Sequence, residues 1–351
     1  MTEKIRLAQG AGGQLMDKLI KEKILKYFSK NQGKAEISLA MLDDSAVIDD
    51  IVFTTDSHTV HPIIFPGGNL GSLAVAGTIN DISVMGAKPI ALSAGFIVEE
   101  GLSMDVFEKI VDSMAKVAKA AAVPIVTGDT KVVEKGAIQE FMINTSGIGK
   151  RTTLLDNNIK VVKKYRSFNS RWLLDSNLRA GDKIILSGNI AEHGITLMSF
   201  REGYGFETKI KSDIAAVNGL MEKALSHGGI VSAKDPTRGG LANTVNEFSD
   251  KSNVGIIIDE EKIPIPKGVK AACNMLGIDP LEIGNEGKVV LGVVKEKADE
   301  VLKAIKKHPL GKNAAIIGEA SKKIEDVVLE TIVGGKRVLH KPLGDPVPRI
   351  C

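Results

Sequence analysis

Aspartate residues recur at points where the sequence predicts that β-strands end. Residues 51–55 are rich in β-branched side chains and predict a buried strand, and Asp56 follows directly. Converging carboxylates supply the hard oxygen ligands that Mg²⁺ prefers, and the metal would hold a nucleotide's phosphates. Any one aspartate alone is more often a helix cap or a turn residue, but the set predicts a metal–phosphate site. The further aspartates, all among small residues that let a ligand approach, are Asp43, Asp44, Asp81, Asp129 and Asp235.

A glycine-rich loop precedes the first predicted helix. Gly10, Gly12 and Gly13 could wrap phosphates through backbone N–H groups, although a lone glycine cluster is not specific. The chain contains neither a Walker motif, G-x-x-x-x-G-K-[ST], nor a G-x-G-x-x-G after a strand, so a nucleotide site would be of another kind. His58 lies near Asp56 in the sequence and could touch a substrate, although a single histidine is more often structural.

The last residue is a cysteine on a tail without a hydrophobic pattern. Residues 341–351 contain three prolines and one glycine, so we expect a mobile tail that is not helical. Ten extended residues span roughly 33 Å, enough to carry the Cys351 thiol into a distant site. Taken alone, Cys351 could equally be an incidental exposed thiol. Cys273 stands among apolar residues and is expected to be a small buried hydrophobe.

Composition limits the classes to which the protein can belong. The chain has 351 residues, 43% of them hydrophobic, which is enough for two domains with cores of their own. The net charge is +3, and residues 151–171 hold six Lys/Arg and one Asp; a solvated loop explains them better than a nucleic-acid site, so no nucleic-acid partner is expected. The uncharged stretch 57–80 is broken by prolines and glycines, so no membrane helix is expected. Two cysteines and no apolar leader indicate a cytoplasmic protein.

Hydrophobic periodicity predicts mixed helices and strands in two halves. Helices are predicted near residues 14–28, 70–85, 103–121, 190–201, 213–227, 239–250 and 298–307. Strands are predicted near residues 51–55, 89–98, 124–127, 138–148, 254–258, 288–294, 313–318 and 326–331. The chain then divides into a glycine loop with its helix, a first domain, a basic linker, a second domain and a mobile tail, at residues 1–34, 35–150, 151–180, 181–335 and 336–351.

Taken in order, these motifs resemble those of a known superfamily. The matching pieces span almost the whole chain, at residues 10–13, 43–47, 55–58, 80–89, 128–133, 235–240 and 285–288. They resemble the enzymes related to aminoimidazole ribonucleotide synthetase, among them selenophosphate synthetase and thiamine-monophosphate kinase. The closing Pro-Arg-Ile-Cys points, within this superfamily, to the HypE family of hydrogenase maturation proteins. The basic stretch 151–171 looks longer than the family's usual interdomain connection.

The resemblance implies a fold and an activity. The fold is α+β, with a PurM-like N-terminal ATP-binding domain that pairs with its twin in a homodimer, an α/β PurM-like C-terminal domain and a flexible C-terminal tail. The activity is that of an ATP-dependent carbamoyl dehydratase that modifies its own Cys351. A carbamoyltransferase, HypF, places a carboxamide on the thiol, and ATP is used to dehydrate it to a thiocyanate. The cyano group then passes to iron on the HypC–HypD complex, for the [NiFe]-hydrogenase active site.

The resemblance also implies roles for individual residues, with ATP and Mg²⁺ as cofactors. The catalytic residues would be Cys351, Lys131 and Glu286. The metal ligands would be Asp43, Asp44, Asp81 and Asp235. The nucleotide would be bound by Gly10, Gly12, Gly13, Asp56, His58, Asn80, Asp129, Thr130, Thr237, Arg238 and Gly239.

Two other kinds of function stay open on the sequence. One is another ATP-dependent member of the superfamily, either selenophosphate synthetase-like or a phosphotransferase. A selenophosphate synthetase would carry a reactive cysteine or selenocysteine near its glycine loop, and residues 9–14 contain no thiol. The other is a nucleotide-binding scaffold without catalysis, against which the intact set of aspartates argues.

Overall fold

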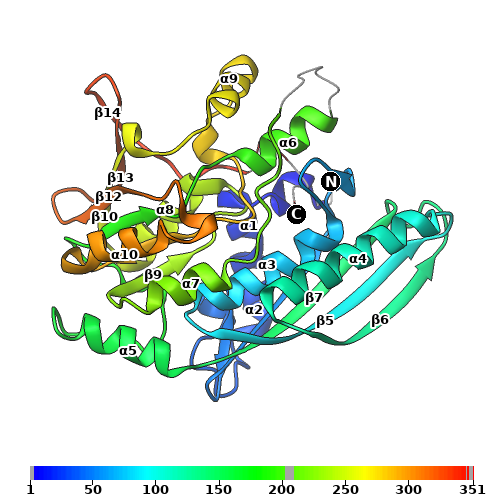
Figure 1. Cartoon of the computed structure of the whole chain (residues 1–351), viewed down its shortest axis with the longest axis horizontal. Coiled ribbons are helices and arrows are strands. Elements are labelled where there is room, and N and C mark those ends of the chain that lie inside the picture. The colour runs from blue at the N-terminus through cyan, green and yellow to red at the C-terminus, as the bar shows by residue number, and fades with distance from the viewer. Residues whose placement is uncertain (1–3, 202–208, 345, 348–350) are drawn as a thin grey trace.

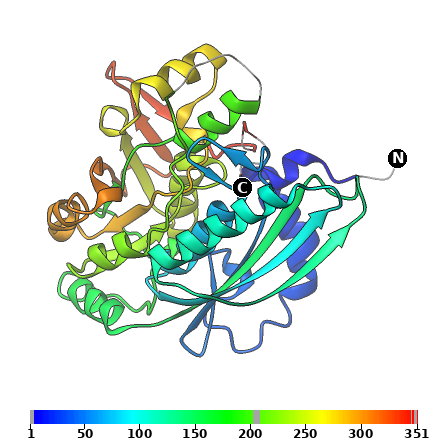
Figure 2. The same cartoon turned by 45° about the vertical axis from the view of Figure 1, so that its right-hand side comes forward.

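Two large β-sheets organise the chain, one in each half (Figure 1 and Figure 2). The structure is a computed structural model that describes residues 4–201, 209–344, 346–347 and 351. A hydrophobic core that is continuous across the two halves joins the sheets, since it includes Val52 and Ile82 from one half and Ile184 and Val290 from the other. None of the helices in these ranges is both long enough and apolar enough to cross a membrane.

The N-terminal sheet is covered by helices on one face. All neighbouring strands are antiparallel except the last pair in the sheet order, β5 and β6. The strand order is β1 (Ala46–Ile48), β2 (Ile51–His58), β7 (Phe141–Lys150), β5 (Lys88–Glu99) and β6 (Ile125–Val133). A short hairpin of β3 (Ile64–Phe65) and β4 (Gly68–Asn69) leads into α3 (Leu70–Val84). Helix α4 (Met104–Ala121), which follows β5, covers the sheet together with α3. Nearly all of α3 is buried, because its small and aliphatic side chains pack between the sheet and the C-terminal half.

The C-terminal sheet is mixed. Its strand order is β14 (Lys336–Val338), β13 (Val327–Glu330), β10 (Gly255–Asp259), β12 (Ala315–Ser321), β8 (Lys183–Leu186), β11 (Val290–Val293) and β9 (Ile230–Lys234). Only β10 and β13 pair in parallel. The helices are α6 (Glu192–Arg201), α7 (Asn218–Leu225), α8 (Gly240–Ser252), α9 (Lys267–Leu276) and α10 (Ala298–Ile305). The predicted α+β class is confirmed, and the domain expected to be α/β has a largely antiparallel sheet rather than a parallel one.

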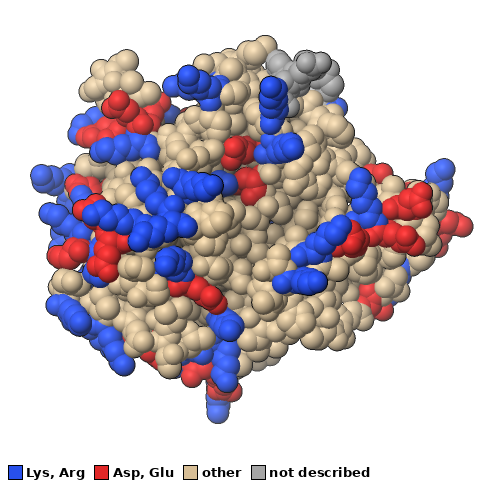
Figure 3. Space-filling view, viewed as in Figure 1, with Lys and Arg blue, Asp and Glu red and all other residues tan. Residues whose placement is uncertain are grey.

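The basic segment between the sheets is folded, which corrects the solvated linker expected at residues 151–180. It contains α5 (Thr153–Val162), and Trp172 is fully buried. Arg166 donates to both carboxylate oxygens of Asp182, at 2.8 and 2.7 Å. On the face drawn in Figure 3, lysines and arginines around α5 and α10 stand among acidic side chains. The local excess of positive charge predicted a solvated segment, but Arg151, Arg166 and Arg171 each pair with an acidic residue in the folded chain.

The segments near the two ends of the chain form regular elements. The helix predicted at residues 14–28 forms α1 (Gly13–Leu19), a π-helical turn (Ile20–Ile24) and α2 (Leu25–Phe28). The mobile tail was expected to begin at residue 336, but its first three residues form β14, which pairs with β13. The second domain therefore extends to residue 338.

Most predicted elements are present, and most of the elements that were not predicted are short strands. The elements not predicted are α5, α9, β1, β3, β4, β8, β9 and β14. Strand β9 is buried along its whole length, so its sequence shows no alternation between apolar and polar residues. Helix α5 lies in the segment expected to be a linker, and α9 lies in a part of the second domain for which no element was predicted.

Two arginines of the folded segment form a matched pair for a stability test. Arg166 and Asp182 are both largely buried, whereas Arg171 contacts Glu36 and Asp50 at the surface. Arg166→Ala leaves a buried carboxylate unpaired, so it should lower the free energy of unfolding by about 3–5 kcal/mol. Arg171→Ala should lower it by less than about 1 kcal/mol. Equal losses in urea denaturation of the two variants would contradict this description of the segment.

Candidate active site

Four aspartates converge between the two sheets. Asp44 precedes β1, Asp56 lies in β2, Asp81 lies in α3 and Asp235 follows β9. The Asp81 carboxylate accepts a hydrogen bond of 2.8 Å from Thr54 Oγ1. Burial raises the pKa of Asp81 well above its usual range, and the nearby charges of the other three aspartates add to the rise. The structure therefore gathers these four in one buried region, which we call the carboxylate cluster.

Two acidic groups show how strongly this region disfavours negative charge. Burial raises the pKa of Asp235 to about 7, although Lys234 opposes the rise. Burial, assisted by Asp235, also raises the pKa of Glu286, and Glu286 Oε1 has no hydrogen-bond partner among the described residues. A buried carboxyl oxygen without a partner is available to a ligand or to a proton in transfer.

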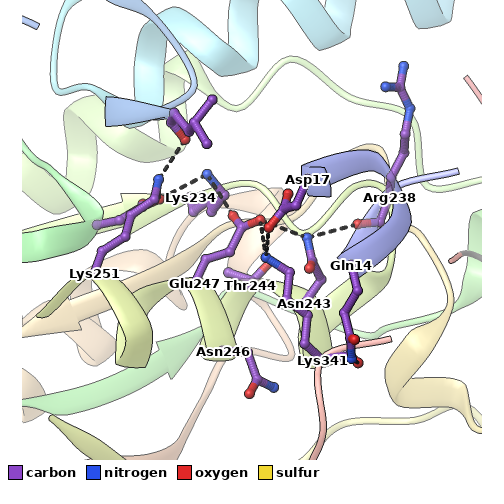
Figure 4. Close-up of polar contacts among 12 residues, drawn as sticks. Gln14, Asp17, Lys234, Arg238, Asn243, Thr244, Asn246, Glu247, Lys251 and Lys341 are labelled. Atoms are coloured by element: carbon purple, nitrogen blue, oxygen red, sulfur yellow. Dashed lines mark hydrogen bonds and ion pairs between the residues drawn. The ribbon is translucent and has the colours of Figure 1, made fainter. Parts of the chain in front are cut away.

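A buried ammonium group neutralises part of this charge. Lys234 Nζ lies 2.6 Å from Asp44 and 3.1 Å from Asp175. It also lies 3.2 Å from Glu247, a contact drawn in Figure 4. Burial opposes the charge, but these three carboxylates raise the pKa of Lys234 well above its usual range. Sequence reasoning missed this group of residues, since the lysine is 59 residues from Asp175 and 190 from Asp44. The lysine before Asp235 in the Lys-Asp-Pro-Thr-Arg motif was its one available signal.

Asp43 has partners of its own. Its carboxylate lies 3.6 Å from Lys251 Nζ and accepts the backbone N–H of Asp175 at 3.2 Å. In the part of the chain that the structure describes, no three Asp, Glu, His or Cys side chains are grouped closely enough to hold a metal by themselves. A cation at the carboxylate cluster would need further ligands from phosphates or water, which is the usual way in which proteins bind Mg²⁺.

The terminal cysteine reaches this region. Arg238 Nε donates a hydrogen bond of 2.9 Å to Cys351 Sγ. Burial raises the pKa of the Cys351 thiol to about 12; Arg238 opposes the rise, and Glu286 and Asp56 add to it. Such a thiol is protonated at neutral pH and is a poor nucleophile in this position. Arg238, expected to bind the nucleotide, thus contacts the sulfur in this structure.

The glycine loop contacts Arg238 and the C-terminal segment, by which we mean the described residues from Lys341 to Cys351. A Cβ atom on Gly12 would lie 2.7 Å from Arg238 Cβ, and one on Gly13 would lie 2.2 Å from the Pro342 carbonyl oxygen. Both glycines have positive φ, at 76° and 67°. The N–H of Gln14 donates to the same Pro342 oxygen at 2.9 Å. The loop expected to wrap phosphates therefore packs on protein atoms, and only Gly10 has open space beside it.

Thr237 and Gly239 build the turn that holds Arg238 between β9 and α8. The N–H of Thr237 donates to the Asp235 carbonyl oxygen at 3.0 Å. Gly239 has a φ of +77°, and a Cβ there would lie 2.8 Å from Asn243 Cβ. Glycine is required at this position because a side chain would be strained and crowded.

Asn80 and His58 are buried beside the carboxylate cluster. Asn80 Nδ2 donates to the carbonyl oxygens of Ala215 and Glu286, and its Oδ1 accepts the N–H of Val217, so its amide joins α3 to the C-terminal half. Neither ring nitrogen of His58 has a hydrogen-bond partner among the described residues, and burial lowers the pKa of this histidine. Asn80 is thus occupied by the fold, whereas both ring nitrogens of His58 are available to a ligand.

Three further predicted residues lie apart from the carboxylate cluster. Asp129, Thr130 and Lys131 are exposed on the edge strand β6, where the register pairs Lys131 with the exposed Ile97. Asp129 and Thr130 border a cavity of about 870 Å³ between α4 and β6 that is lined mainly by apolar side chains. Within one chain, the structure does not bring Lys131 to Cys351 or Glu286.

Comparisons with known proteins supply the family. Residues 42–150 match the N-terminal domain and residues 179–329 the C-terminal domain of the AIR synthase related proteins. The carbamoyl dehydratase HypE of Rhizobium leguminosarum bv. viciae is 44% identical over 99% of this chain and 95% of its own length. A crystal structure of a HypE–HypF complex has 43% identity and a TM-score of 0.83, covering 92% of this chain and 99% of that one. A crystal structure of HypE in complex with ATP has 39% identity and a TM-score of 0.78, covering 99% and 100%. The chain therefore belongs to the HypE family of carbamoyl dehydratases, within the AIR synthase related proteins.

Proposed function

We propose that this chain uses ATP to dehydrate a carboxamide on the sulfur of Cys351, giving an S-cyanate that donates cyanide to the iron of a [NiFe]-hydrogenase. One observation carries the proposal. The terminal thiol lies against Arg238, within electrostatic reach of Glu286 and Asp56. A protonated thiol held beside crowded carboxylates suits a carrier of a substrate group better than a nucleophile. The activity named for the family's relatives identifies the group it carries.

The chemistry explains the need for ATP. Dehydration removes the oxygen of an amide, which is a poor leaving group. Transfer of the γ-phosphoryl group of ATP to that oxygen makes it leave as phosphate. The carbon–oxygen bond breaks, the two nitrogen protons leave and a carbon–nitrogen triple bond remains, so the S-carboxamide and ATP give the S-cyanate, ADP and phosphate. Attachment to the chain's own sulfur makes the step intramolecular.

Glu286 is the proposed base for the nitrogen protons. Its carboxyl group is buried with a raised pKa, and Oε1 lacks a partner among the described residues. A carboxylate with a raised pKa is the stronger base once it is ionised. Arg238 is proposed to keep the sulfur in place, and Lys131 to transfer a proton or bind phosphate.

ATP is proposed to bind at the carboxylate cluster of one chain, with β6 of a second copy of the chain completing the site. A HypE in a solved structure is in complex with ATP. The cavity bordered by Asp129 and Thr130 has an apolar lining that suits a nucleotide base. Mg²⁺ is proposed at Asp44, Asp81 and Asp235, where burial, together with neighbouring carboxylates, raises the pKa of each carboxyl group. When bound, the metal would neutralise charge on the phosphates.

A homodimer is proposed because Lys131 lies away from the carboxylate cluster of its own chain. The open face of the five-stranded sheet exposes large apolar side chains, at Ile51, Phe53, Ile97 and Ile148. Exposed apolar surface of this kind is typical of protein interfaces. A second copy on this face would cover it, and Lys131 would then act at the partner's carboxylate cluster.

Two partners and a location are proposed on the family relation. A HypF-type carbamoyltransferase would supply the carboxamide, since a solved HypE is in complex with HypF. A HypC–HypD complex would accept the cyano group on iron. Both cysteines are free thiols, which suits a reducing cytoplasm.

Phosphate release tests the proposed function. Carbamoylated protein mixed with ATP and Mg²⁺ should release one phosphate per modified chain in a single turnover, because each Cys351 carries one amide. Cys351→Ala should bind ATP with unchanged affinity in calorimetry yet release no phosphate above background. Cys273→Ala, at the other thiol, should behave like the wild type. Release from Cys351→Ala at the wild-type rate would contradict the proposal.

The raised pKa of Asp235 predicts how Mg²⁺ stabilises the protein. Its pKa rises from 3.8 to about 7 on folding, so the metal-free protein should lose stability as the pH rises between these values. Mg²⁺ should raise Tm more at about pH 8 than at about pH 5.5, because it binds the ionised carboxylate. Asp235→Asn should raise Tm of the metal-free protein at pH 8 and reduce the Mg²⁺ response, whereas the exposed Asp326→Asn should do neither. A response independent of pH and of Asp235 would exclude this site.

Mixed dimers test whether Lys131 acts across the subunit boundary. Lys131→Ala and Cys351→Ala chains should each be inactive alone. After subunit exchange, mixed dimers hold one intact pair of Lys131 and Cys351, so cyanation should recover to about a quarter of the wild-type level. Each variant exchanged with itself should stay inactive. Absence of recovery, with exchange verified by native mass spectrometry, would rule out the shared site.

A further inference from the structure

Glu247, on α8, lies between the carboxylate cluster and the C-terminal segment, and its two carboxylate oxygens have different partners. Oε2 is 3.2 Å from Lys234 Nζ, the ammonium that also lies 2.6 Å from Asp44. Oε1 is 3.4 Å from Lys341 Nζ and accepts a hydrogen bond of 3.1 Å from Asn243 Nδ2. One carboxylate therefore contacts both the cation beside the carboxylate cluster and a cation of the C-terminal segment (Figure 4).

A second connection runs from Glu247 to the reactive sulfur. Asn243 Nδ2 also donates to the Arg238 carbonyl oxygen at 3.3 Å, and Arg238 Nε holds Cys351 Sγ at 2.9 Å. The C-terminal segment is thus fixed at two places, at Lys341 and at Cys351, and both places connect to Glu247. Lys341 has a further partner in Asp17 of α1, at 2.6 Å.

The charges of this group depend on one another. The Lys234, Lys341 and Glu247 side chains are only 9%, 14% and 15% exposed. Burial opposes ionisation of Glu247, but Lys234, Lys341 and Lys251 lower its pKa to about 2. Removing one member of a buried ionic group leaves the others with uncompensated charge. Loss of the Glu247 charge would therefore loosen Lys341 and leave Lys234 to Asp44 and Asp175 alone.

We propose that Glu247 is a positioning residue that holds the Cys351 sulfur at the carboxylate cluster, acting through Lys341 and through Asn243 and Arg238. The proposal rests on the proposed function, because it gives that sulfur its role. Glu247 contacts neither the sulfur nor the aspartates of the carboxylate cluster directly. Its effect is therefore on the position of Cys351. This assigns a role to a residue that lies outside every motif recognised in the sequence.

Alkylation of Cys351 by iodoacetamide, followed by peptide mass spectrometry, tests the positioning directly. Release of the half-buried thiol from its place against Arg238 restores an ordinary pKa, so Glu247→Gln and Lys341→Met should each raise the alkylation rate by about ten-fold. Because both changes break the same link, the double variant should be no faster than the faster single variant. Lys336→Met, which removes an exposed ion pair on β14, should leave the rate unchanged.

Two outcomes of this experiment would overturn the proposal. One is an unchanged alkylation rate in Glu247→Gln. The other is a double variant whose rate is the product of the two single effects, which would show that the residues act separately. Alkylation needs neither ATP nor a carbamoylating partner, so its result stands even if the proposed dehydration is wrong.

The reaction itself gives a second readout. Glu247→Gln should slow dehydration of the carbamoylated thiol by about ten-fold at saturating ATP, while the Kd for ATP changes by less than about two-fold. Glu247→Asp keeps the charge and should recover part of the rate. A general loss of structure would weaken ATP binding together with the rate and would not be reversed by aspartate, and that result would overturn the positioning role.

Discussion

Desolvation of negative charge is the constraint on which the rest of this structure depends. Asp44, Asp56 and Asp81 come from the N-terminal half, and Asp235 comes from the C-terminal half, so the carboxylate cluster exists only when the halves pack together. Buried carboxylates at this density are unstable without positive charge. Lys234 supplies one such charge from β9, and the raised pKa values show that the compensation is incomplete. A cation, or a ligand that brings one, would complete this compensation.

The segments near both chain termini contribute to this site. The glycine loop and α1 contact Lys341, Pro342 and Gly344, and Arg238 holds the final thiol. In this position the thiol is protonated and close to Glu286. This environment suits a residue that carries a modified group, whereas a catalytic nucleophile needs a lowered thiol pKa. The N-terminal segment thus contributes to the site by fixing the C-terminal one.

The predictable part of the site consists of residues whose local sequence carries the signal. Aspartates next to strands and small residues could be found because a strand end and an approachable backbone are local features. Cys273 was expected to be buried from its apolar neighbours, and it is. Lys234, Asp175 and Glu247 could not be found in this way, because an ion pair between residues far apart in the chain leaves no local pattern. The basic segment was wrongly expected to be solvated for the same reason, because only folding brings Arg166 to its partner, Asp182.

The central claim is that Cys351 carries the group that is dehydrated, and mass spectrometry of the C-terminal peptide tests it most directly. After incubation with a carbamoylating partner, ATP and Mg²⁺, the peptide that ends in Cys351 should first gain a carboxamide and then lose one water. The loss of water should require ATP, and the peptide that contains Cys273 should keep its mass throughout. An unmodified C-terminal peptide, or the same mass changes on Cys273, would contradict the account.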